Sequence, residues 1–231
     1  MAKTTVQNFV NRVKRSFDYN ITDTDLDTLI LDFLNDALQE VKQLFFDYGL
    51  LDEITASDSF STVASTAYVD IATETADLDE IIVLYEKTND KVIEIIPYDE
   101  FVVLYPDSAA DSATTPDHAA RFLNRIYFGP TPNSIITIYM DYIKLITVIT
   151  AVSGSLPFED KFDPIISAIT IEGLGRWMNP SDAISNTLYK ARAKELKESL
   201  IANASKNVGM NRQTGSRRPS IPYFAPKKVI S

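Results

Sequence analysis

The chain has 231 residues, of which 45% are hydrophobic, with a net charge of −10, no cysteine and one histidine. This composition is typical of a globular protein with one sizeable domain or two small ones. The lack of cysteine excludes disulfide bonds, thiol catalysis and thiolate metal sites. No apolar run is long enough to span a membrane and the first residues lack a secretion signal, so we expect an intracellular protein.

The charge is divided unevenly along the chain. From Lys206 onward there are six basic residues and no acidic one, so residues 1–205 carry the other 16 basic residues against all 32 acidic ones. An acidic body with a basic tail is the result. Because nucleic-acid binding needs clustered Lys and Arg, we expect the body not to bind DNA.

The first two elements are predicted to be helices over residues 4–17 and 25–48. Both segments carry apolar residues at spacings of three and four, which places those residues on one face of a helix. We expect Thr22, with Asp25 three residues later, to cap the second helix. Gly49 is expected to end that helix in the left-handed conformation.

Residues from about 58 to 150 are predicted to form a β-rich insertion. Short runs of β-branched and aromatic residues alternate there with turn formers, which favours a small antiparallel sheet. A helical turn is expected within residues 97–107, followed by an exposed polar loop over 108–117. The single histidine, His118, is expected to be a solvated loop residue rather than a ligand or a base.

The helical spacing returns near the C-terminus and predicts two helices, over 163–178 and 180–205, separated by an Asn-Pro pair. Asp163 before a proline is expected to cap the first helix, and Asp182 is expected in the first turn of the second. The second helix has one apolar seam and one charged side, so we expect it to be half exposed or to contact a partner. The predicted fold is therefore α+β. It has a helical bundle core of N-terminal helices and a C-terminal hairpin, a β-rich middle insertion and an extended C-terminal arm.

We divide the chain into a body, residues 1–205, and an arm, residues 206–231. The arm combines positive charge with proline-spaced aromatic residues, which favours docking on another protein; the alternative is an idle linker or a purification remnant. The expected docking residues are Arg212, Arg217, Arg218, Pro219, Pro222, Tyr223, Phe224, Lys227 and Lys228.

The sequence patterns that could indicate a metal, cofactor or catalytic site are incomplete. Asp23, Asp25 and Asp27 open like a calcium loop, but Thr28 stands where glycine is needed and Leu34 where glutamate is needed. The glycines of "GLG", residues 173–175, lie in a helical segment rather than after a strand, so they do not predict a dinucleotide site. We expect them either to allow close approach of another helix or to loosen their own helix. Pairs of neighbouring carboxylates are expected to be solvated surface, and we predict no catalytic residue, metal site or cofactor.

The order of elements resembles the head-to-tail connector proteins of tailed bacteriophages. The resemblance lies in "LDTLILDFLNDALQEV" with Asn35, Asp36 and Ala37, in "IYFGPTPNSIITIYMDYI", and in the helical hairpin of residues 156–200 with Tyr189. It implies a structural virion protein, made in the host cytoplasm, that forms a ring, usually a dodecamer, at the portal vertex.

The same resemblance implies that the arm docks on the portal protein, that a tail or nozzle protein binds the opposite end, and that DNA passes through the ring without specific binding. The residues expected to pack helices of the ring are Trp177, Tyr189, Leu196 and Leu200. Two alternatives remain open: a small hydrolase or nuclease that uses carboxylates and magnesium, and an intracellular scaffold unrelated to phages.

Overall fold

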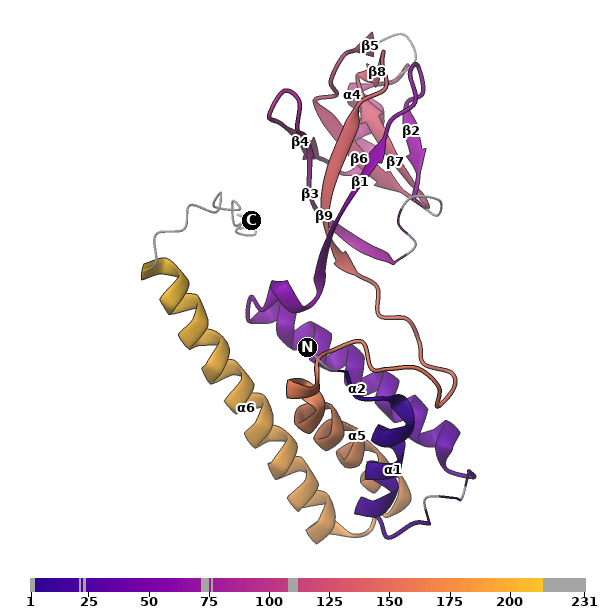
Figure 1. The fold of residues 1–231 in the computed structure, drawn as a ribbon, viewed down its shortest axis with the longest axis vertical. Coiled ribbons are helices and arrows are strands. Elements are labelled where there is room, and N and C mark those ends of the chain that lie inside the picture. Colours follow the sequence, from indigo (N-terminus) through magenta and orange to yellow (C-terminus); the bar gives the residue numbers. More distant parts are fainter. Residues whose placement is uncertain are drawn as a thin grey trace, which may run out of the picture.

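The computed structural model describes residues 3–20, 22, 24–71, 75, 77–107 and 112–213, the last ten of them as backbone alone. Helices gather at one end of the elongated molecule and a curled β-sheet occupies the other end (Figure 1). The predicted α+β fold, with a helical bundle and a β-rich insertion between its second and third long helices, is confirmed.

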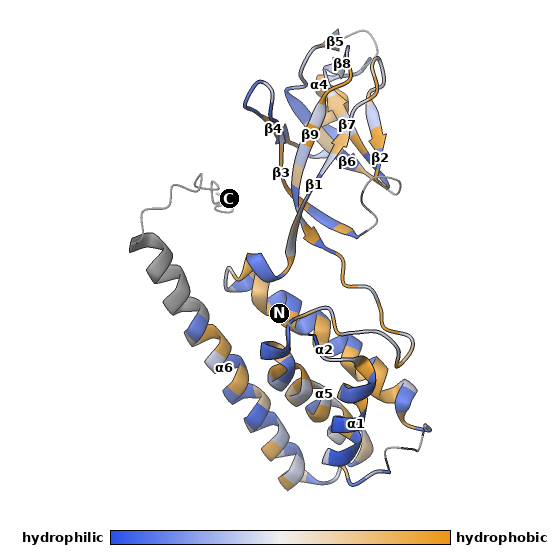
Figure 2. Ribbon diagram, in the orientation of Figure 1, coloured by the Kyte–Doolittle hydropathy of each residue, from blue (hydrophilic) through white to orange (hydrophobic). Residues whose placement is uncertain are grey.

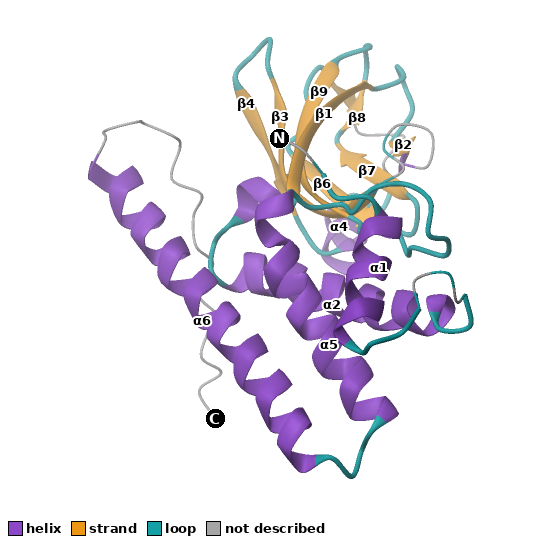
Figure 3. Ribbon diagram, turned by 60° about the horizontal axis from the view of Figure 1, so that its bottom comes forward, coloured by secondary structure: helices purple, strands orange, loops and turns teal. Residues whose placement is uncertain are grey.

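The helical end is built from four longer helices around one apolar core. Helix α5 lies among the others because apolar residues occupy most of its circumference, whereas α6 carries many hydrophilic residues and runs along one side of the bundle (Figures 2 and 3). The core includes fully buried Phe9, Leu34 and Ile166. The bounds are α1 Val6–Ser16, α2 Asp27–Asp47, α5 Asp163–Met178 and α6 Ala183–Gln213, with short 3-10 helices at η1 Leu51–Glu53 and η2 Asp160–Phe162.

Two of the predicted helix starts are wrong. Leu26 occupies the cap position of α2 without a side-chain hydrogen bond, and the Thr22 hydroxyl donates instead to Asn20. Asp163 is the first residue of α5 rather than its cap, because η2 continues directly into α5 and turns the Asp163 carboxylate toward Thr4 and Arg12.

The predicted helix ends were partly right. Gly49 has φ = +71°, its amide donates to the Phe46 carbonyl and the Leu50 amide donates to the Phe45 carbonyl, which is the expected left-handed end of α2. The end predicted for α6 at 205 is too early, because the helix continues to Gln213. The first residues of the predicted extended arm are therefore helical.

The sheet has seven strands in the order β1-β9-β3-β4-β6-β7-β2, and β5 pairs with β8 separately. Most pairs are antiparallel, but β4 and β6 are parallel, and so are β5 and β8, so the prediction of an antiparallel sheet is wrong at these two points. Helix α4, Tyr98–Leu104, connects this part of the sheet and confirms the predicted helical turn. The bounds are β1 Thr55–Ser61, β2 Tyr68–Asp70, β3 Leu78–Glu86, β4 Lys91–Ile95, β5 Ser112–Ala113, β6 His118–Phe122, β7 Arg125–Gly129, β8 Thr131–Pro132 and β9 Thr137–Lys144.

The expectation of a solvated loop at His118 is also wrong. His118 opens β6, where it pairs with Gly129 of β7, and its side chain is 26% exposed. Its Nδ1 lies 2.7 Å from the Tyr105 hydroxyl, in a hydrogen bond that links the end of α4 to the sheet. Sequence reasoning missed this strand because "HAARF" has neither the alternation nor the β-branched residues of the other strands.

Candidate interaction surfaces

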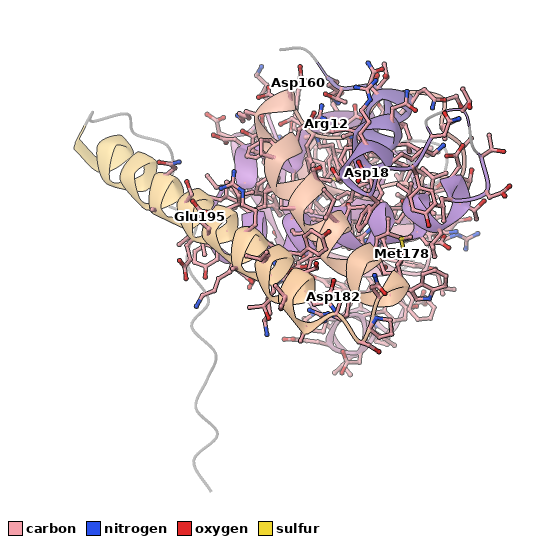
Figure 4. All side chains as sticks on the ribbon, turned by 90° about the horizontal axis from the view of Figure 1, so that it is seen from below. Arg12, Asp18, Asp160, Met178, Asp182 and Glu195 are labelled. Atoms are coloured by element: carbon pink, nitrogen blue, oxygen red, sulfur yellow. The ribbon has the colours of Figure 1, made fainter. Side chains whose placement is uncertain are left out.

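The α5–α6 hairpin is the most regular surface-forming unit of the helical end. Asp182 lies at the turn between the two helices, just beyond Met178 (Figure 4), and its carboxylate accepts a hydrogen bond of 3.1 Å from the Ser185 amide. This bond, made at the positive end of the α6 dipole, holds the pKa of Asp182 below its ordinary value. A charged cap therefore fixes where α6 begins.

Two glycines of α5 allow its neighbours to approach. A Cβ atom at Gly173 would lie 2.7 Å from the Phe33 ring of α2, and one at Gly175 would lie 2.7 Å from the Tyr189 ring of α6. Of the two roles expected for these glycines, close approach of another helix is the one that the structure displays. The two glycines face different helices, so α5 packs closely between α2 and α6.

The four predicted packing residues do not share one surface. Tyr189 lies against Gly175, and its ring meets Phe17 edge to face at 5.8 Å between centroids. Leu196 and Leu200 are half-buried against the helical core of their own chain. Trp177, by contrast, is 61% exposed near the end of α5. The first three therefore hold the hairpin to its own bundle, whereas Trp177 lies at the surface.

A second apolar stripe on α6 escaped the sequence prediction. Ile184 is 76% exposed and Leu188 is 64% exposed. At 100° per residue they lie on the side of α6 opposite fully buried Ala193, which faces the bundle. The sequence does contain a signal for them, a second set of residues spaced by four and three. It was missed because one apolar seam was already sufficient to predict the helix.

A groove runs along α6 between that helix and the rest of the bundle. It consists of two volumes of about 430 and 340 Å³, and both are lined by Pro164 and Leu196, where they meet. We call these two volumes together the α6 groove. Apolar side chains dominate its lining, among them Ile171 at one end and Phe162 at the other.

Charged side chains stand along this groove. Arg12 of α1 lies 3.3 Å from the Asp163 carboxylate, and Figure 4 places it over the start of α5 near Asp160. Lys161 lies 2.6 Å from Glu53, and that hydrogen bond contributes most to raising the pKa of Lys161. Both basic groups are 47% exposed, so they can meet further acidic groups from outside.

The sheet end presents an aromatic surface of its own. Tyr98 of α4 stacks on Phe122 of β6 with ring centroids 4.2 Å apart, and it also packs on Tyr127. Val103 is 78% exposed on α4, and Leu123 is 76% exposed at the β6–β7 turn. The elements that carry this surface, α4, β6 and β7, belong to the sheet end of the molecule (Figure 1).

The residues predicted to dock on another protein fall largely beyond the described part of the chain. Arg212 lies in the last turn of α6, whose side chains are not described there. The other predicted docking residues are outside the described residues: Arg217, Arg218, Pro219, Pro222, Tyr223, Phe224, Lys227 and Lys228.

Side chains that could take part in a reaction are engaged in structural contacts. The Tyr142 hydroxyl donates to Asp77 at 2.9 Å, and burial together with that carboxylate raises the pKa of Tyr142 to about 12. In the described residues no three His, Cys, Asp or Glu side chains are grouped closely enough to bind a metal ion. Among the described helices, none combines the length and apolar character that crossing a bilayer requires.

Comparison with known protein families gives a match over most of the chain. The model of the SU10 adaptor protein family matches residues 4–219, which is nearly the whole chain. No curated protein sequence matches it.

Proposed function

Because the chain belongs to the SU10 adaptor protein family, a family of phage head-to-tail adaptors, we propose that it forms a ring between the portal and the tail. A phage structural adaptor is a component of the virion, and the expected connector family is confirmed. Membership of this family overturns the alternative of a scaffold unrelated to phages. The ring, its dodecameric size and its place at the portal vertex belong to the proposal.

The observation that carries this proposal is the difference between the two faces of α6. This helix has 31 residues; along residues 183–203, whose side chains are described, one face packs on its own bundle, while apolar residues on the opposite face lie in solvent. A closed ring needs two different complementary faces on each subunit. A long helix with a second apolar face supplies one of them. No observation favours the carboxylate hydrolase or nuclease, and we propose a protein that is not an enzyme.

The division of charge supports the proposed path of DNA. Residues 1–205 carry twice as many acidic as basic residues, and the chain from Lys206 onward is basic. A wall of negative charge repels phosphates, so the genome can pass through the ring without specific binding. The basic, aromatic arm is then the part suited to the portal protein, and the aromatic surface of the sheet end is suited to a tail or nozzle protein.

Removal of residues 214–231 tests the arm without shortening α6. We expect the truncated protein to fold and to lose attachment to purified capsids that carry the portal. A second, full-length variant replaces only Tyr223 and Phe224 by serine. It keeps the charge of the arm and removes its aromatic anchors. Unimpaired attachment of the truncated protein would refute the role of residues 214–231, which contain all the predicted docking residues except Arg212.

Electron microscopy of the protein, alone and mixed with portal, tests the ring itself. Rings on the portal, seen end-on, are expected. A protein that binds portal-bearing capsids only as separate subunits would contradict the ring while leaving the adaptor family intact.

A further inference from the structure

The sheet end is a single insertion into the helical end. The chain leaves the bundle where η1 is followed by β1, and it returns where β9 ends at Lys144. The two crossings are neighbours, because the Lys144 amide donates to the Ile54 carbonyl at 2.8 Å. The sheet end is therefore connected to the bundle by one pair of adjacent strands (Figure 1). Strands of a two-stranded ribbon twist relative to each other more strongly than those of a wide sheet.

A β-bulge lies beside these crossings, at the start of β3. The register of β3 against β9 shifts by one residue between Leu78 and Glu80, so Asp79 is an extra residue without a partner on β9. A bulge of this kind bends the strand and changes the direction of a side chain. Here the Asp79 carboxylate reaches α2, where it forms an ion pair with the Lys42 ammonium. The bulge thus supplies a contact to the helical end.

The bulge itself is fixed to the sheet end. The Asp79 carbonyl accepts a hydrogen bond from the Arg121 guanidinium of β6. Two residues earlier, the Asp77 carbonyl accepts a hydrogen bond of 2.6 Å from the Leu145 amide, which directly follows β9. A force on the Asp79 carboxylate is therefore passed to the sheet rather than absorbed by a loose side chain.

Apolar contacts also join the two ends. Ile143 of β9 is buried in the helical core, and Ile82 of β3 packs against that core. Apolar burial is non-directional, so these contacts hold the ends together at more than one angle. A hydrogen bond between charged groups depends on distance and direction, so the pair of Lys42 and Asp79 favours one angle.

A cavity of about 450 Å³ lies at the same place. Val6 and Phe158 line it from the helical end, and Asp77 and Lys144 line it from the sheet end. Protein interiors are normally close-packed, with few voids larger than a water molecule. The junction between the two ends is open on this side, so the sheet end has space to tilt.

We propose that Asp79 and Lys42 form a latch, and that the sheet end tilts on the crossings of β1 and β9 when this latch opens. The latch sets the direction in which the sheet end faces, while the apolar contacts keep the two ends joined. This inference goes beyond the proposed ring, because it concerns a single subunit. In the proposed adaptor, such a tilt would let the two ends fit different neighbouring proteins without strain in either contact.

A pair of spin labels measures the angle between the two ends. Because the chain has no cysteine, Ile135→Cys on the sheet end and Asp32→Cys on α2 introduce two labelling sites, both at exposed positions. We expect double electron–electron resonance to give one narrow distance distribution for the protein with an intact latch. Lys42→Gln should at least double the width of this distribution, or shift its maximum, with an unchanged circular dichroism spectrum.

Asp79→Asn opens the same latch from the other side and should give the same change. It decides the matter if Lys42→Gln does not fold, because the Asp79 side chain is 44% exposed, against 14% for that of Lys42. Lys161→Gln is the matched control, since it removes an ion pair with Glu53 within the helical end. An unchanged distribution in folded Asp79→Asn would overturn the inference, and so would an equal change in Lys161→Gln. The measurement uses the free subunit, so a failure of the proposed ring would leave its result unaffected.

Discussion

Asn35 of α2 holds the backbone of Ile149 at two points. Its Nδ2 donates to the Ile149 carbonyl at 3.0 Å, and the Ile149 amide donates to its Oδ1 at 2.9 Å. Ile149 lies in the segment that leads from β9 back to α5. A single side chain thus takes the place of a strand partner and fixes the return path from the sheet to the bundle.

Replacement of Asn35 by Asp should destabilise the protein by about 1–3 kcal/mol, because the carboxylate cannot donate and faces the Ile149 carbonyl. Urea unfolding measures this loss. The exposed neighbour provides the control, and Asp36→Asn should change the free energy of unfolding far less. Equal stability of Asn35→Asp and the wild type would contradict the role given to this pair.

Gly175→Ala should loosen the hairpin. The added methyl group overlaps the Tyr189 ring, and overpacking of this kind costs about 1–3 kcal/mol. Thermal unfolding of the single variants and of Gly175→Ala with Tyr189→Ala gives the coupling between the two positions. We expect the double variant to be more stable than the sum of the two single losses predicts, because without the Tyr189 ring the added methyl group has space. Additive losses would show that the methyl group and the Tyr189 ring do not interact.

A buried ion pair ties α1 to the start of α2. The Lys14 ammonium, whose side chain is 1% exposed, lies 2.5 Å from the Asp27 carboxylate, which is 16% exposed. Asp27→Asn removes the facing charge and should lower the free energy of unfolding by about 3–5 kcal/mol. Guanidinium denaturation measures it, with Asp32→Asn on the exposed side of α2 as control. A loss no larger than that of the control would show that water replaces the carboxylate.

Glu86 should make the stability of the β3–β4 turn depend on pH. Burial favours the neutral acid, but hydrogen bonds from Thr88 and Asn89 outweigh it and hold the pKa of Glu86 below its ordinary value of 4.5. A depressed pKa contributes stability above the unfolded-state pKa, and this contribution is lost as pH falls through the folded-state pKa.

Glu86→Gln should therefore be less stable than the wild type at neutral pH, and the difference should shrink as pH falls below about 4.5. Urea midpoints measured from neutral to acidic pH follow this change. Glu80→Gln, also on β3 but exposed, should show no such convergence. A constant difference between Glu86→Gln and the wild type across the range would exclude ionisation as its cause.

The amino-acid sequence by itself determined the periodic elements. Apolar spacing of three and four located α2 and α5, Gly49 ended α2 where expected, and β-branched runs located β3, β4 and β9. These features depend on contacts within a few residues, so a local pattern is sufficient to predict them. The family resemblance, carried by the order of these same elements, was confirmed over residues 4–219.

Only the tertiary structure decided which surfaces are free. The polar strand β1 exists because β9 pairs with it, His118 is held in β6 by β7 and Tyr105, and Asp163 turned from a cap into a partner of Arg12. Leu188 and Tyr189 are neighbours in one helix, yet Tyr189 faces its own bundle and Leu188 faces solvent. Long-range packing, which no local pattern contains, selects the face of a helix that is buried and thereby the face that is left for a partner.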